Sequence, residues 1–446
     1  MSLPPRERNA EAGRRVLFRS GMGSFALRAV NALAAASLTI LMARGLGPSG
    51  YGVYTYALAL VMLLNVPTQG GLPILVVRET AAALAHMQID RVYRLWRWAT
   101  AITLGLALTV ALVGITVGWL FRAHFEPVAW NSFLLALLLV PLIVLGNLCG
   151  AALRGVHRVL LGQWPEYLLR PALLLLAILA YRGFAGDTMR ADVAVGLHTL
   201  AAAVALMISA PLLWRARPQR ERPVAASADD TPPTWLSSMI PLTLLSAMQM
   251  ILQYTDLVML GFFRSSETVG LYRVAAQASL CVSFGLLAVN LIVAPQFARD
   301  HAKGDMARLQ QVTTLSARLV LLLTLPVTLV FLMVAEPIVT FVFGAAYGGS
   351  GTALGILAIG QLCNAAFGSV VFLLNMTGHE RDTVRGLSIG VVVNALLNLA
   401  LIPLFGINGA AAATALTLLI WNVLLWRAVR RRLGIDSTAL GLRVAR

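Results

Sequence analysis

Charged side chains are scarce in this chain. Only 12% of its 446 residues are Asp, Glu, Lys or Arg, whereas 59% are hydrophobic and the mean hydropathy is +0.79. A soluble domain carries about a quarter charged residues, so the composition excludes a soluble enzyme. It also excludes a disordered or a collagen-like chain. The sequence has long apolar runs instead, which indicate a polytopic helical membrane protein.

Motifs for catalysis and metal binding are also missing. Cys149, Cys281 and Cys363 lie in apolar runs, without the spacing of a CxxC or Cys/His metal site. The chain has no GxxxxGK[ST] phosphate loop, no HExxH and no GxSxG. We therefore expect no metal, no cofactor and no enzymatic activity.

The charge that is present is strongly basic. The chain has 35 basic and 19 acidic side chains, for a formal charge of +16, and every basic residue except Lys303 is arginine. No basic stripe with interleaved aromatics lies outside the apolar segments, so we expect no nucleic-acid partner. Basic residues of membrane proteins collect in cytoplasmic loops, and this bias can orient the chain.

Twelve segments are long and apolar enough to cross a membrane, each needing about 20 residues. They are 22–43, 53–76, 98–121, 131–152, 164–184, 191–213, 236–262, 270–297, 315–335, 352–374, 384–404 and 409–427. With the N-terminus inside, only five basic residues fall in outer loops, namely Arg44, Arg122, Arg182, Arg190 and Arg264. We therefore expect both termini in the cytoplasm.

The two halves of the chain look like repeats. Gly52-Val53-Tyr54 follows the first span and Gly270-Leu271-Tyr272 follows the seventh, at an offset of 218 residues. Two halves of six spans each must have the same orientation, so an axis along the membrane normal would relate them. We expect bundles over 21–213 and 235–427, a cytoplasmic linker over 214–234 and a basic cytoplasmic tail over 428–446.

Residues 1–20 form a separate, polar segment. The run from Arg14 to Ser20 (RRVLFRS) is what the end of a common sequencing adapter would encode if it were read in frame. We therefore expect this segment to be non-native or disordered, and nothing below rests on it.

Several motifs resemble those of polysaccharide-type flippases. They are Ala43–Tyr54 (ARGLGPSGYGVY), Val77-Arg78-Glu79, Asp256 with Gly261 and Val269–Tyr272, Asn394 with Asn398 and Pro403, Gly406–Ala411, and Arg430–Ile435. Because these motifs occur in this order and at matching positions relative to the spans, the chain resembles the polysaccharide transporter family, which includes O-antigen flippases. This family belongs to the multidrug/oligosaccharidyl-lipid/polysaccharide exporter (MOP) superfamily.

The resemblance implies an all-α fold with two six-helix bundles around a central cleft. It implies a flippase that moves polyprenyl-diphosphate-linked oligosaccharide to the outer leaflet of the bacterial inner membrane by alternating access, for surface polysaccharide such as lipopolysaccharide O-antigen. Expected partners are membrane lipids and the polymerase and glycosyltransferases of the pathway. A lipid II flippase or a multidrug antiporter of the same superfamily is the alternative. A membrane-embedded polymerase or ligase is less favoured, because the outer loops are short.

Two polar residues of the first span are candidates for substrate binding. A charge at membrane depth costs about 2.5–3.5 kcal/mol, so it usually faces a cavity. Arg28 suits a diphosphate, and Asn31 shares its face of the helix. The alternative for Arg28 is snorkelling to the nearby inner surface.

In the second half, Asp256 and Arg273 lie in consecutive antiparallel spans, near the same end. They form either a structural ion pair or a gate or cation-coupling site, in which Arg273 also contacts substrate. Asn394 and Asn398 are four residues apart and share a helix face. They either contact the sugar or form hydrogen bonds between helices.

The second span contains helix-weakening residues, namely Pro67, Gly70, Gly71 and Pro73. Proline removes a backbone donor and glycine lowers helix propensity. Unwound backbone at membrane depth is tolerated against protein or water. We expect a kinked segment that lines a cavity and acts as a hinge; a static packing kink is the alternative.

Overall fold

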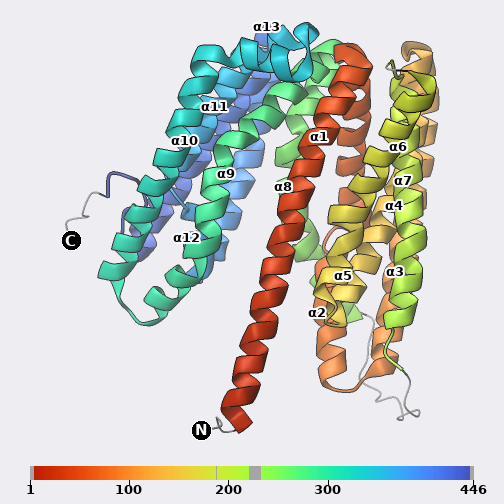
Figure 1. Cartoon of the computed structure of the whole chain (residues 1–446). Coiled ribbons are helices and arrows are strands. Elements are labelled where there is room, and N and C mark those ends of the chain that lie inside the picture. The colour runs from red at the N-terminus through yellow and green to blue at the C-terminus, as the bar shows by residue number, and fades with distance from the viewer. Residues whose placement is uncertain (1–4, 187, 220–232, 442–446) are drawn as a thin grey trace. The chain divides into compact units, whose positions relative to one another are not determined.

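The computed structural model describes residues 5–186, 188–219 and 233–441, and every regular element within these ranges is a helix (Figure 1). A bilayer offers no water to backbone N–H and C=O groups, and a helix satisfies them within one segment. The expected all-α class is confirmed.

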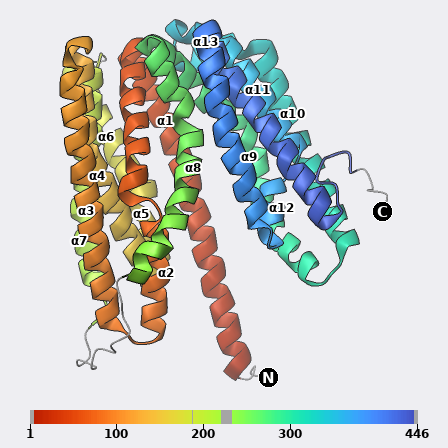
Figure 2. The ribbon, with the colours of Figure 1, turned by 180° about the vertical axis from the view of Figure 1, so that it is seen from behind.

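The elements of the first half are α1 (Pro5–Gln69), α2 (Leu72–Ala85), α3 (Ile89–Leu120), η1 (Arg122–His124), α4 (Pro127–Gly155), α5 (Val159–Trp164), η2 (Pro165–Leu169), α6 (Arg170–Ala185) and α7 (Ala191–Ala216). Those of the second half are α8 (Pro233–Phe263), α9 (Ser266–Ala302), α10 (Met306–Phe343), η3 (Ala345–Ser350), α11 (Gly351–Ala366), α12 (Val370–Met376) and α13 (Glu380–Leu433). Figure 2 shows the same ribbon from behind.

Ten helical segments of the described chain are long and apolar enough to cross a membrane. Two of them are Val30–Gln69 of α1, with 40 residues, and Glu380–Leu433 of α13, with 54 residues, and one crossing needs only about 20. The backbone leaves helical geometry at Gly47 (φ 66°, ψ 174°) in α1 and at Gly406 (φ 56°, ψ −126°) in α13. Each of these helices therefore contains two spans, which gives the twelve that the sequence predicts.

The chain forms two compact units. The first comprises residues 1–45 and 60–247, and the second comprises 46–59 and 248–446, so that α8 contributes to both. The bundle limits expected from the sequence stay a prediction, and most of the expected linker lies outside the described residues. Helix α1 begins at Pro5, so most of the backbone of segment 1–20 is helical, but its side chains lie outside the described residues.

In the first unit, α4 contacts α2, α3 and α7. A buried cluster joins α2, α3, α4 and the start of α8, and its members are Leu72, Leu75, Val76, Leu95, Ala99, Leu148, Ala151, Ala152 and Trp235. Lipid tails are as apolar as these side chains, so close packing rather than the hydrophobic effect holds such helices together.

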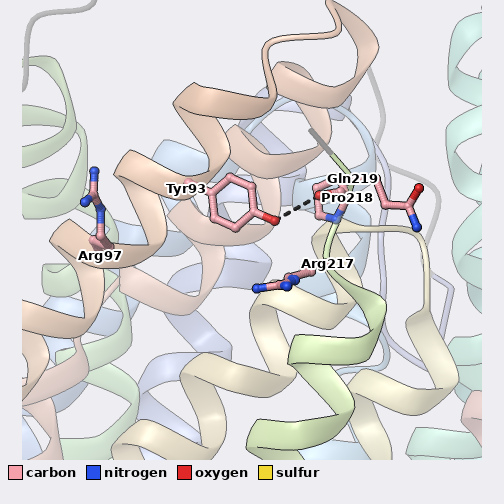
Figure 3. A pocket seen from close by; sticks show the side chains of 5 residues that line it. All are labelled: Tyr93, Arg97, Arg217, Pro218 and Gln219. Carbon is pink, nitrogen blue, oxygen red and sulfur yellow. Dashed lines mark hydrogen bonds between the residues drawn. The ribbon is translucent and has the colours of Figure 1, made fainter. Parts of the chain in front are cut away.

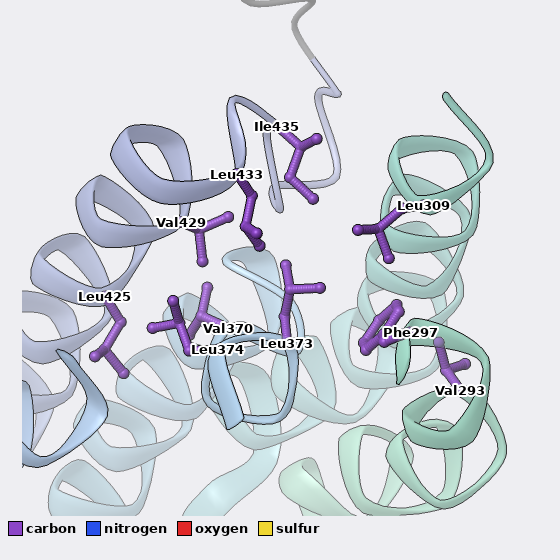
Figure 4. Close-up of a cluster of buried hydrophobic side chains, with 10 residues drawn as sticks. All are labelled: Val293, Phe297, Leu309, Val370, Leu373, Leu374, Leu425, Val429, Leu433 and Ile435. Carbon is purple, nitrogen blue, oxygen red and sulfur yellow. The ribbon is translucent and has the colours of Figure 1, made fainter. Parts of the chain in front are cut away.

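In the second unit, a buried cluster joins the ends of four helices to the chain that follows α13 (Figure 4). Its members are Val293, Phe297, Leu309, Val370, Leu373, Leu374, Leu425, Val429, Leu433 and Ile435. Gln310 of α10 holds this chain by hydrogen bonds to both backbone groups of Asp436, each at 2.7 Å. The segment after α13 is thereby fixed against α10.

Candidate functional site

The second unit buries a carboxylate inside a predicted span, that of Asp256 on α8. Its side chain is only 6% exposed, and four neutral donors surround it. Tyr272 donates its hydroxyl to Oδ2 at 2.7 Å, and Thr414 donates to the same oxygen. The Nδ2 atoms of Asn394 and Asn398 donate to Oδ1 at 3.1 and 2.6 Å. We call Asp256, Tyr272, Asn394, Asn398 and Thr414 the Asp256 cluster.

The fold of α13 explains how distant residues reach this carboxylate. Asn394 and Asn398 lie on one face of the first arm of α13, because residues four apart stack on a helix. The chain leaves helical geometry at Gly406, and the second arm carries Thr414 back alongside them. A Cβ on Gly409 would lie 2.1 Å from the Leu401 oxygen, so only glycine allows the two arms to approach this closely.

Arg264, just after α8, fixes the turn between the two arms. Proline at position 403 removes a backbone donor from the helix. The Arg264 guanidinium donates to the Pro403 oxygen at 2.6 Å and to the Ile402 oxygen at 3.3 Å. The end of α8 is thereby tied to the turn of α13, and both helices contribute to the Asp256 cluster.

The acceptors of the two asparagines are unused. Asn394 Oδ1 and Asn398 Oδ1 are buried and have no hydrogen-bond partner among the described residues. Amide oxygen and nitrogen exchange places by rotation of the side-chain amide. Rotated amides would add two oxygens to those of the carboxylate and the hydroxyls, and oxygen is the ligand type that hard cations prefer. The cluster therefore presents oxygen atoms of the kind that bind a proton or a small cation.

Arg273 does not pair with Asp256. It follows Tyr272 on α9 and is half-buried. Within the described ranges, Arg273 and Asp256 form no ion pair with each other. The structural ion pair that the sequence allowed is therefore wrong, because neutral hydroxyl and amide groups take up the carboxylate oxygens. The roles of Arg273 in gating and substrate binding stay a prediction.

The candidates of the first span are less defined. The side chain of Arg28 lies outside the described residues, and Asn31 is half-buried on α1 in the first unit. The structure brings Asn394 and Asn398 together with Asp256, which is the hydrogen bonding between helices that was the alternative for them. Contact of either asparagine with sugar stays a prediction.

The expected kink of the second span coincides with a break between two helices. Helix α1 ends at Gln69 and α2 begins at Leu72, with Gly70 at φ +40°. The backbone N–H of Gly71 donates to the Thr243 hydroxyl at 3.0 Å. Pro67 lies before the break and Pro73 lies in the first turn of α2. Whether the segment bends during a transport cycle stays a prediction.

The first unit contains a second polar site. A cavity of about 20 Å³, the size of one water molecule, lies between α4, η2, the start of α6 and α7. Asn147, Glu166, Arg170 and Ser209 contribute its polar lining. The η2 segment is a π-helical turn, and such turns inside helices are frequent at functional sites.

Reasoning from the sequence missed Tyr272 and Thr414. Single hydroxyls in apolar helices are common and carry no spacing signal. Tyr272 was part of a repeat motif, and nothing in that motif relates it to Asp256, which is 16 residues away. Only the folded hairpins bring the two hydroxyls to one carboxylate.

The long apolar helices define a polytopic membrane protein. The model of the family described as "Polysaccharide biosynthesis protein" matches residues 20–301, which is more than half of the chain. The chain belongs to this family, and the resemblance found in its motifs is confirmed.

Two curated relatives come from Haloferax volcanii. The "Probable low-salt glycan biosynthesis flippase Agl15" is 30% identical over 174 residues, which is 38% of this chain and 36% of that protein. The "Probable flippase AglR" is 26% identical over 184 residues, which is 41% of this chain and 38% of that protein. The matched part thus spans little more than a third of the length of these relatives.

Solved structures of the MOP superfamily share the fold. An inward-facing MATE-family multidrug resistance transporter has a TM-score of 0.69 at 13% identity and covers 91% of this chain and 94% of its own. The lipid II flippase MurJ, in an inward closed conformation, has a TM-score of 0.72 at 13% identity and covers 93% and 87%. These relatives and structures are named as flippases and transporters rather than enzymes, in agreement with the expectation from the sequence.

Proposed function

We propose that this protein is a flippase that moves polyprenyl-diphosphate-linked oligosaccharide from the cytoplasmic to the outer leaflet by alternating access. Its family and its fold support a transporter, and both Haloferax relatives are named as flippases. We place it in the cytoplasmic membrane of a bacterium with both termini inside, because the arginines favour the loops on that side.

The buried carboxylate of Asp256 carries the proposal. A charge within a membrane span is costly, and such residues mark ion pathways and proton relays. Its hydrogen-bond partners are neutral, so none of them balances the charge of the carboxylate. We infer that a proton or a sodium ion binds at Asp256 and energises the transport cycle. Rotation of the Asn394 and Asn398 amides would supply the ligands that the cation needs.

We assign recognition of the cargo to the basic and polar residues of the spans. Arg28 and Arg273 match the negative charge and the geometry of a diphosphate, and Asn31 extends the polar face beside Arg28. The break at Gly70 and Gly71 supplies a hinge, because a helix interrupted there bends without losing hydrogen bonds inside a regular segment.

The alternatives differ in their cargo. A lipid II flippase would carry the same diphosphate, and the fold match with MurJ does not separate the two, because 13% identity shows fold alone. A multidrug antiporter of cationic compounds would need acidic residues along its substrate path, whereas the charged residues that we assign to the cargo, Arg28 and Arg273, are basic. We propose surface-polysaccharide assembly, with the polymerase and glycosyltransferases of that pathway as functional partners.

Complementation of a flippase-deficient strain tests the proposal. Wild type is expected to restore surface glycan, whereas Asp256→Asn at equal membrane abundance is expected to restore less than a tenth of it. Asp192→Asn is the matched control, since Asp192 pairs with Arg190 at 2.8 Å outside the span core. Full restoration by Asp256→Asn would overturn coupling at this site, and failure of wild type to restore any glycan would overturn the proposed cargo.

A further inference from the structure

The first unit has an open pocket at the end where α3 begins and α7 ends (Figure 3). Its volume is about 460 Å³, and Tyr93, Arg97, Arg217, Pro218 and Gln219 line it. The hydroxyl of Tyr93 donates to the Pro218 oxygen at 2.9 Å and so fixes the chain after α7 against α3. The pocket is therefore bounded by two elements that are joined to each other.

Two arginines give this pocket its charge. Arg97 lies one helical turn after Tyr93. Figure 3 shows the Arg217 side chain below the Tyr93 hydroxyl and the Arg97 side chain beyond the other edge of the ring, pointing away from Arg217. Neither guanidinium forms an ion pair in the part of the chain that the structure describes. Glu79, on the helix before α3, is already paired with Arg78 and Arg91, each at 3.1 Å. Among the described residues, the pocket therefore presents two positive charges without an acidic partner.

We place the pocket at the depth of lipid head groups. Helix α3 has 32 residues and α7 has 26, whereas about 20 cross the hydrocarbon, so their ends extend into the interface. The guanidinium of Arg217 lies 4.7 Å from the centre of the Trp214 ring, and Trp98 packs on Trp235 at 5.3 Å. Tryptophan concentrates at membrane interfaces, which agrees with this depth.

An apolar stripe leads from the pocket toward the middle of the membrane. Leu104, Leu108 and Leu112 are 40%, 57% and 66% exposed, and they follow Arg97 at spacings of seven, four and four residues. These spacings keep all of them on one face of α3. A phosphate held at Arg97 would thus have a path for its acyl chains along the same helix.

We propose that this pocket binds the phosphate head group of an anionic membrane phospholipid. Arg97 and Arg217 contact the phosphate, the ordered Tyr93–Pro218 link holds the two walls together, and the acyl chains lie along the α3 stripe. Basic pockets at helix ends bind anionic lipid head groups in this way. The site lies within the first unit and does not depend on the proposed cargo.

Native mass spectrometry of the full-length protein tests the proposal, with phosphatidylglycerol as ligand and phosphatidylcholine as the neutral comparison. Wild type is expected to prefer phosphatidylglycerol. Each of Arg97→Gln and Arg217→Gln is expected to weaken binding about fivefold, and the double variant about twenty-five-fold. Arg122→Gln is the matched control, because Arg122 is exposed and lies 5.9 Å from the Trp130 ring without a second arginine. Its binding is expected to equal that of wild type.

Two further measurements keep the test decisive. The Arg97→Lys/Arg217→Lys double variant retains both charges and is expected to keep most of the preference, which separates charge from misfolding. Farnesyl diphosphate competes if the pocket belongs to a diphosphate-linked cargo instead. Undiminished binding in the glutamine double variant, equal binding of phosphatidylcholine, or displacement by farnesyl diphosphate at lower concentration than phosphatidylglycerol would each overturn the proposal.

Discussion

Gly52 and Gly270 face each other in a reciprocal contact. A Cβ on Gly52 would lie 1.6 Å from the Ser266 oxygen, and a Cβ on Gly270 would lie 2.1 Å from the Pro48 oxygen. The offset of 218 residues relates Gly52 to Gly270 and also Pro48 to Ser266. The two contacts are therefore equivalent under exchange of the two repeats, and the repeat inferred from sequence has a counterpart in the packing.

Adding a methyl group at this contact should destabilise the protein. We expect Gly52→Ala and Gly270→Ala each to cost about 1–3 kcal/mol, because backbone atoms cannot move aside as a flexible side chain would. The double variant should cost less than the sum, since both substitutions force the same helices apart. Thermal unfolding in detergent measures this. Gly105→Ala has no atom within 4 Å of the new Cβ and should not lower stability.

The hydrogen bonds of the Asp256 cluster should act together. Tyr272→Phe removes the 2.7 Å bond to the carboxylate and should cost about 1.5–3 kcal/mol, the range for bonds to charged groups. In an Asp256→Asn background the same substitution should cost about 1 kcal/mol less, because the acceptor is then neutral. A double-mutant cycle by chemical unfolding measures the difference, and equal costs in the two backgrounds would argue against a charged acceptor.

The tie between Arg264 and α13 should stabilise the hairpin that carries Asn394 and Thr414. We expect Arg264→Gln to cost about 1–2 kcal/mol, because the Pro403 oxygen loses its donor at 2.6 Å. Arg264→Lys should recover part of this loss, since one ammonium can still reach one carbonyl. Thermal unfolding provides the measurement. Arg299→Gln, at the exposed end of α9, serves as the control and should change stability by less than about 0.5 kcal/mol.

The chain after α13 should be released from α10 when the hydrogen bonds between Gln310 and Asp436 are removed. Gln310→Leu keeps the bulk of the side chain but leaves both backbone groups of Asp436 without their partner, at a cost of about 1–3 kcal/mol. Limited proteolysis should then cut between 435 and 441 faster than in wild type. Gln311 is the neighbouring residue and is exposed, so Gln311→Leu should leave the cutting rate unchanged. Equal rates in both variants would contradict a role of Gln310 in holding this chain.

The span count and the class of protein were predictable from the sequence. The thickness of the bilayer sets the length of an apolar segment, so composition along the chain predicts the spans directly. The break at Gly70 and Gly71 was predictable for a similar local reason, because glycine and proline act on the helix that contains them.

The partners of Asp256 were not predictable in the same way. The cost of a charge within a span drew attention to Asp256, and the spacing of four residues drew attention to Asn394 and Asn398. These asparagines are 138 and 142 residues from Asp256, and no local rule relates such positions. The pocket of Arg97 and Arg217 was not predictable for another reason. Arginine is common in every loop on the expected cytoplasmic side, so these two residues did not stand out.

The central claim is that a cation or proton bound at Asp256 energises the movement of a lipid-linked glycan. The direct measurement is the leaflet distribution of fluorescent polyprenyl-diphosphate oligosaccharide in proteoliposomes, with an imposed sodium or proton gradient. We predict that wild type moves the lipid faster under one of the two gradients and that Asp256→Asn loses this acceleration. Equal rates for wild type and Asp256→Asn under both gradients would contradict the account.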